Sequence, residues 1–146
     1  MRFTVIFLAA LLVCFTGCSN ESRVSPPPTA HHQKNNMITP EALEEMFANM
    51  RNAQWDVDGE LLWGYFFTDP DPRKLERVVE PLTNAGFKFV SIYETDDRST
   101  HFLHVERVEK HTPQTLKARN DEFYKLAEEF DLESYDGMDV GPVLVK

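Results

Sequence analysis

The stretch from His101 to Lys110 holds the residues best suited to chemistry. His104 and Glu106 are two positions apart, so in a strand they share a face, whereas His101 and His104 point to opposite sides. His111 follows at the next turn. A histidine beside a carboxylate can serve as a general base or bind zinc. One hypothesis is therefore a metal-dependent or hydrolytic enzyme that uses His104, Glu106 and His111.

Other features of the sequence argue against this chemistry. No third ligand stands at a suitable spacing from His104 and Glu106. The acidic segment 56–60 lacks the downstream glutamate of a calcium loop, and phosphate-binding or HExxH motifs are absent from the sequence. We therefore expect no metal, no cofactor and no catalytic residue, and the leading hypothesis is a non-enzymatic binding protein.

Aromatic residues are concentrated in a strand predicted over residues 61–68. Trp63, Tyr65 and Phe67 share one face of this strand, and Leu62 and Phe66 lie on the other. A sheet that is covered by helices on one side needs only one apolar face. The surplus either deepens the core or forms a surface that binds a protein. We take Trp63, Tyr65 and Phe67 as candidate partner-binding residues.

The elements that position these residues begin only after residue 36. Thr39-Pro40, Asp71-Pro72 and Thr112-Pro113 each pair a helix cap with a proline at the first helical position. Pro81 should kink or shorten the second helix, and Gly86 suits its end. Strands are predicted over 61–68, 87–95, 101–110 and 140–145. After the lead helix, this order predicts an α+β, ferredoxin-like split βαββαβ fold, with a four-stranded antiparallel sheet and helices on one face.

The N-terminal segment, residues 1–17, has the pattern of a signal peptide. Arg2 is followed by an apolar run over residues 3–15, and small residues follow at Thr16 and Gly17. This run of 13 residues is too short for a membrane span, which needs about 20. We therefore expect residues 1–17 to be removed during export.

The segment Phe15-Thr16-Gly17-Cys18 resembles the lipobox of bacterial lipoproteins. The resemblance implies lipid on Cys18 and attachment to a membrane of the bacterial cell envelope. Ser19 after the cysteine indicates the outer membrane, on its periplasmic side. Plain secretion with an unmodified Cys18 is the alternative.

The chain is acidic, and its composition separates a proline-containing segment from a domain. The 15 Lys and Arg against 24 Asp and Glu give a net charge of −9, and loss of Arg2 with the signal makes it −10. An acidic chain is poorly suited to binding nucleic acid. Residues 18–36, with three prolines at 26–28, are predicted to be a flexible tether, and residues 37–146 a single domain.

The closing segment, residues 111–143, resembles the regulator of ribonuclease E activity B family. Its most specific feature is Tyr135-Asp136-Gly137, read as a turn after a Leu-Ala helix, and the Leu62–Phe67 strand also fits. The resemblance implies a ferredoxin-like domain without catalysis that binds ribonuclease E and reduces RNA cleavage. A lipoprotein does not meet a cytoplasmic ribonuclease, so we expect another protein partner, bound through the sheet and through Tyr135, Asp136 and Gly137.

Overall fold

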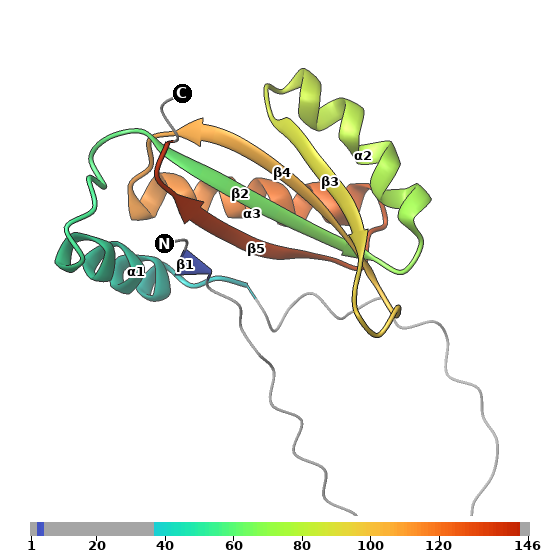
Figure 1. Cartoon of the computed structure of the whole chain (residues 1–146), viewed down its shortest axis with the longest axis horizontal. Helices are drawn as coiled ribbons and strands as arrows, with labels where there is room; N and C mark the ends of the chain where they lie inside the picture. The colour runs from blue at the N-terminus through green and yellow to red at the C-terminus, as the bar shows by residue number, and fades with distance from the viewer. Residues whose placement is uncertain (1–2, 5–36, 144–146) are drawn as a thin grey trace, which may run out of the picture.

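The structure, a computed structural model, describes residues 3–4 and 37–143, so the predicted lipidation residue Cys18 and the tether lie outside the described residues. The elements in chain order are β1 (Phe3–Thr4), α1 (Pro40–Asn52), β2 (Leu61–Asp69), α2 (Pro72–Asn84), β3 (Lys88–Glu94), β4 (His101–Glu109), α3 (Pro113–Glu129) and β5 (Ser134–Gly141). The strands form one antiparallel sheet in the order β1-β5-β2-β4-β3 (Figure 1). From β2 to β5 the order of elements is βαββαβ, which confirms the predicted ferredoxin-like α+β fold behind a lead helix.

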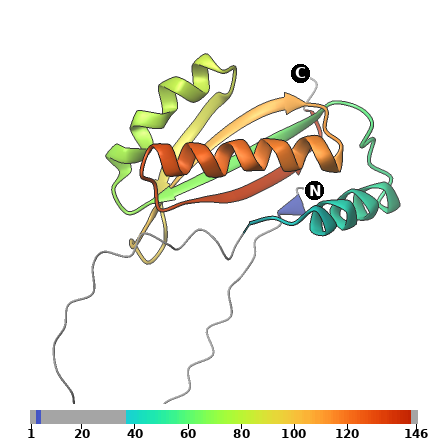
Figure 2. The same ribbon diagram turned by 180° about the vertical axis from the view of Figure 1, so that it is seen from behind.

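The helices cover one face of the sheet and leave the other open. In Figure 1 the sheet lies in front of α3, and the reverse view in Figure 2 shows α3 running across the strands. Helix α1 lies beside the sheet, where Phe47 stacks on Trp63 with ring centroids 6.1 Å apart. Within the described residues, no helix has the length and apolarity that crossing a bilayer requires. We call the uncovered side of the sheet the open face.

The predicted helix starts are confirmed by their caps. The side chains of Thr39, Asp71 and Thr112 accept backbone N–H bonds at the starts of α1, α2 and α3. Pro81 lies inside α2 but does not end it, and the helix continues for three more residues to Asn84. A proline removes only one backbone donor, so the rest of the helical hydrogen bonds can remain. Gly86, with φ of +90°, follows the helix end as predicted.

The last strand differs from its prediction. It was expected over 140–145 but spans Ser134–Gly141, so Tyr135-Asp136-Gly137 belongs to a strand and not to a turn. Asp136 occupies a β-bulge, since Phe66 pairs with Gly137 and Phe67 with Tyr135. The +109° φ of Gly137 accommodates this irregularity, and pairing with β2 overrides the local preference of Asp and Gly for turns. The short edge strand β1 was not predicted.

Gly64, in the middle of β2, is a point of close packing on the open face. It pairs with Glu106 on one side and Asp139 on the other. A Cβ atom on Gly64 would lie 2.7 Å from His104 Nε2 and closer still to Asp139 Oδ1. The missing side chain therefore lets the side chains of His104 and Asp139 lie over β2.

Gly64→Ala should lower the free energy of unfolding by about 2 kcal/mol, because the added methyl group overpacks this position. The control is Gly59→Ala, whose Cβ would lie 2.6 Å from Oδ2 of the exposed Asp56, a side chain that can turn away. We expect the control to stay within about 0.5 kcal/mol of wild type. Urea unfolding at pH 7 measures both, and equal stabilities of all three proteins would contradict the close packing.

Candidate functional site

The aromatic residues of β2 lie beneath the helices. Trp63, Tyr65 and Phe67 are each at most 1% exposed. Phe123 of α3 packs against Tyr65 and Phe67, with ring centroids 4.8 and 5.2 Å apart. The structure therefore places the three residues in the core, which was the alternative considered above. This corrects their assignment to a binding surface, because a partner cannot reach buried rings.

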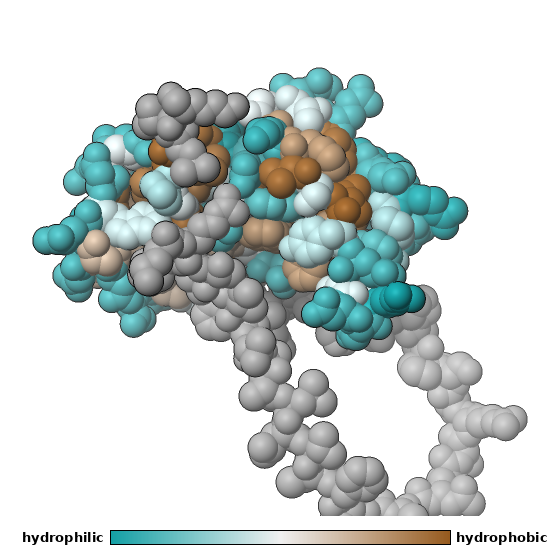
Figure 3. Space-filling model, viewed as in Figure 1, coloured by the Kyte–Doolittle hydropathy of each residue, from teal (hydrophilic) through white to brown (hydrophobic). Residues whose placement is uncertain are grey.

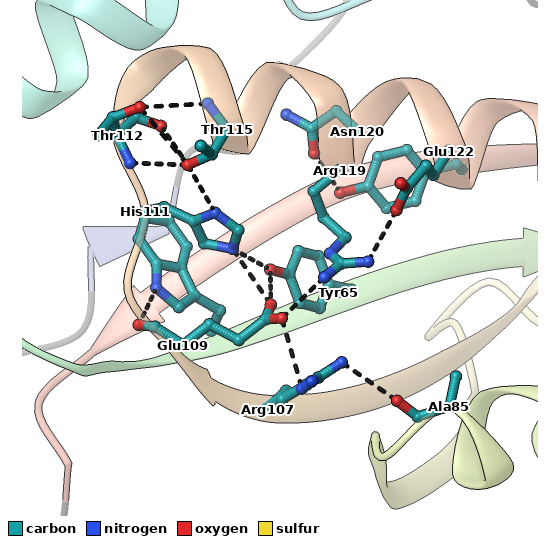
Figure 4. Close-up of polar contacts among 12 residues, drawn as sticks. Tyr65, Ala85, Arg107, Glu109, His111, Thr112, Thr115, Arg119, Asn120 and Glu122 are labelled. Carbon is teal, nitrogen blue, oxygen red and sulfur yellow. Dashed lines mark hydrogen bonds and ion pairs between the residues drawn. The ribbon is translucent and has the colours of Figure 1, made fainter.

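A polar network on the helix-covered face is centred on Glu109 at the end of β4. Tyr65 Oη donates to Glu109 Oε2 at 2.9 Å, and the Arg119 guanidinium donates to Oε1 at 2.8 Å (Figure 4). His111 Nε2 lies 3.1 Å from Oε2, and Arg107 Nε lies 3.4 Å from Oε1. One carboxylate thus connects β2, β4, α3 and the segment between β4 and α3. We call these five residues the Glu109 network.

Local structure fixes the position of His111 in this network. Its Nδ1 lies 3.2 Å from Oγ1 of Thr115, in the first turn of α3. Thr115 and Thr112 form a reciprocal capping box, in which Thr115 Oγ1 accepts from the Thr112 backbone N–H at 2.8 Å. The start of α3 therefore holds the imidazole ring against Glu109.

The lowered pKa of Glu109 keeps its carboxylate ionised at neutral pH. Burial alone would raise the pKa of Glu109, but hydrogen bonds from His111 and Tyr65 and the charge of Arg119 outweigh it and lower the pKa to about 2. Burial and the adjacent Glu109 carboxylate raise the pKa of the Tyr65 hydroxyl. At neutral pH the carboxylate is ionised and the phenol is protonated, far from the matched values that favour proton transfer. The Glu109 network therefore joins β2, β4 and α3 through an ionised carboxylate.

The open face carries the other predicted pair. His104 stacks on Phe66, with ring centroids 4.5 Å apart and planes 18° apart. His104 Nε2 lies 3.6 Å from Glu106 Oε1, so these two residues share a face as expected. Asp139 reaches the same face from β5, on the far side of Gly64. His104, Glu106 and Asp139 are each at most 8% exposed.

The third residue of the enzyme hypothesis lies elsewhere. His111 packs edge-on against Trp63, 5.3 Å between centroids, under the helices, whereas His104 and Glu106 lie on the open face. The sheet separates them, so they cannot act on one substrate or bind one ion. Among residues 3–4 and 37–143, no group of three or more His, Cys, Asp or Glu could hold a metal. The hypothesis built on His104, Glu106 and His111 is therefore corrected.

The predicted Tyr135-Asp136-Gly137 site is mostly inside the protein. Tyr135 is 3% exposed, and its hydroxyl donates to Asn120 Oδ1 of α3 at 2.7 Å. Gly137 is buried as well, whereas Asp136 is exposed. Partial burial and the nearby Glu133 raise the pKa of Asp136. Of the six predicted binding residues, only Asp136 is accessible to a partner through its side chain.

Accessible apolar residues occur instead on the open face. Tyr93 is 45% exposed and stacks on Phe102 of the neighbouring strand, with centroids 5.6 Å apart. Val108 is 41% exposed, and Phe66 is half-buried beside His104. Figure 3 shows apolar surface interrupted by polar groups on this side of the molecule. We call Phe66, Tyr93 and Phe102 the open-face patch.

The sequence analysis missed Glu109 and Arg107. The available signal was strand alternation, because both positions share a face with Leu103 and Val105, which are fully buried. A charge on a buried face needs a partner of opposite charge. Arg107 and Glu109, two residues apart, supply part of this compensation for each other.

Glu109→Gln should lower the free energy of unfolding by about 2 kcal/mol at pH 7, since a depressed pKa stabilises the folded state when the group is ionised. The wild-type advantage should be complete above about pH 4.5 and decline toward pH 2, because the pKa of Glu109 in the folded protein lies below its usual value of 4.5. Urea unfolding at pH 7 and pH 3 measures this difference.

The matched control is Glu122→Gln, which removes the other carboxylate bound to Arg119. Its side chain is 62% exposed, so we expect a loss of less than about 0.5 kcal/mol. If Glu109→Gln were as stable as Glu122→Gln at pH 7, the Glu109 network would not stabilise the fold.

Comparison with known proteins adds the family. A comparison with curated proteins found no match. The family described as regulator of ribonuclease activity B matches residues 40–140, from the first residue of α1 to nearly the end of β5. This match covers more than half of the chain and every element of the sheet except β1. The chain belongs to the regulator of ribonuclease activity B family.

Proposed function

We propose that this protein is a non-enzymatic regulator that acts by binding another protein at the bacterial cell envelope, where lipid on Cys18 anchors it. The observation that carries the regulatory role is the family match over residues 40–140, because this is a family of regulators and not of enzymes. The anchor rests on the lipobox resemblance at residues 15–18. Attachment on the periplasmic side of the outer membrane would leave the domain at the end of a tether.

The open face is the surface that best fits a protein partner. The other face is occupied by helices, and its aromatic residues are buried. On the open face, Tyr93 is 45% exposed and Val108 is 41% exposed. Exposed aromatic groups with a polar surround are typical of protein interfaces. An envelope location would separate the protein from cytoplasmic ribonuclease E, so the proposed partner is an envelope protein.

Lipidation can be tested with the two cysteines of the chain. Cys18→Ala should abolish incorporation of labelled palmitate, whereas Cys14→Ala should keep it, because residue 14 lies in the segment predicted to be removed. Fluorography of the immunoprecipitated protein measures this. A labelled Cys18→Ala protein, or an unlabelled wild type, would contradict the anchor.

Partner binding can be tested in cells with a photo-crosslinking amino acid at position 93. We expect capture of one discrete envelope protein, since this side chain is exposed on the open face. The control places the same amino acid at position 125, which is exposed on α3. Mass spectrometry identifies the products, and identical products from both positions, or capture of ribonuclease E, would refute the proposal.

A further inference from the structure

The edge of the sheet at β5 already pairs with a strand. The residues of β1 lie antiparallel to β5, with Phe3 opposite Val140 and Thr4 opposite Asp139. Figure 1 shows β1 beside the end of β5, outside the four strands of the domain. Since β1 belongs to the segment predicted to be removed, the mature protein would lack this pairing. An edge strand without a neighbour presents backbone donors and acceptors that can pair with another chain.

Only the second half of β5 is regular enough to accept a strand. The first half contains the bulge at Asp136, and Ile38 Cδ1 lies 3.6 Å from the Cβ position of Gly137. Bulges and covering segments are the devices that protect sheet edges from pairing. From Met138 to Gly141 the pairing with β2 is regular, and β1 lies along this part. We call Met138–Gly141 the acceptor edge.

Strand alternation specifies the side chains that an added strand would present. The residue opposite Val140 lies on the face that holds Trp63, because Val140 pairs with Trp63. The residue opposite Asp139, and those two positions away, lie on the open face. There they lie beside Asp139, directly across the strand pair. An apolar side chain fits the first position, and Lys or Arg fits the second set.

We propose that the acceptor edge of the mature protein binds an extended segment of its partner as an added antiparallel strand, with Lys or Arg on the open face. The proposal rests on the proposed function, because it names how the envelope partner would be held. The sequence Arg2-Phe3-Thr4 of this chain has the same pattern of one apolar and one basic residue. Phe3 is opposite Val140, and Arg2 is two positions from Thr4, which is opposite Asp139. The net charge of −10 on the mature chain also favours a basic segment.

The test uses the lipidated mature protein in detergent and a labelled hexapeptide amide with the sequence of residues 1–6. We expect saturable binding by fluorescence anisotropy and slower amide hydrogen exchange at residues 138–141. A peptide with Arg2→Glu should bind about tenfold more weakly, because a charge-assisted contact is lost. Asp139→Asn should weaken binding of the original peptide about as much, while Glu94→Gln, on the opposite edge strand β3, should not change it.

The outcomes separate this proposal from the proposed function. Absence of peptide binding, equal binding of both peptides, or protection outside 138–141 would overturn the acceptor edge. Protection of 138–141 that rises with protein concentration in the absence of peptide would assign the edge to a second copy of this chain and would also overturn it. If the acceptor edge failed these tests but crosslinking from position 93 still captured an envelope protein, the proposed function would stand without the acceptor edge. If crosslinking from position 93 captured no envelope protein, the proposed function itself would be refuted.

Discussion

A single carboxylate on the buried face of the sheet, Glu109, constrains the rest of the structure. Desolvation of a charge costs several kcal/mol unless other groups compensate it, and here a phenol, an imidazole and two guanidinium groups do so. These groups come from β2, β4, α3 and the segment before α3. Because all four groups must reach the same carboxylate, α3 is held in position across the sheet. The position of α3 in turn buries Tyr65 and Phe67, while Phe47 of α1 covers Trp63.

The two faces of the sheet consequently differ in kind. The helix-covered face holds the Glu109 carboxylate, whose lowered pKa keeps it ionised, and the Tyr65 phenol, whose raised pKa keeps it protonated. The open face holds His104, Glu106 and Asp139 around Gly64, together with the open-face patch. Because the sheet separates His111 from His104 and Glu106, histidines that look like a catalytic set in the sequence lie on opposite faces and have different partners.

Local signals in the sequence predicted most of the fold. Thr39-Pro40 and Thr112-Pro113 marked helix starts correctly because capping depends on residues within one turn. The start of β5 was missed because Asp136-Gly137 has the local chemistry of a turn, and only pairing with the distant β2 makes it a bulged strand. The candidate site was less predictable. Alternation showed that Trp63, Tyr65 and Phe67 share a face, but whether helices cover that face depends on tertiary packing, and so do the partners of Glu109.

The proposed function depends on partner binding through the uncovered side of the sheet and the edge beside it. The most direct measurement is amide hydrogen exchange of the lipidated protein, alone and in complex with the envelope protein captured in cells. We predict slower exchange in β4 and at residues 138–141, with α2 and α3 unchanged. Protection confined to α2 and α3 would contradict the claim.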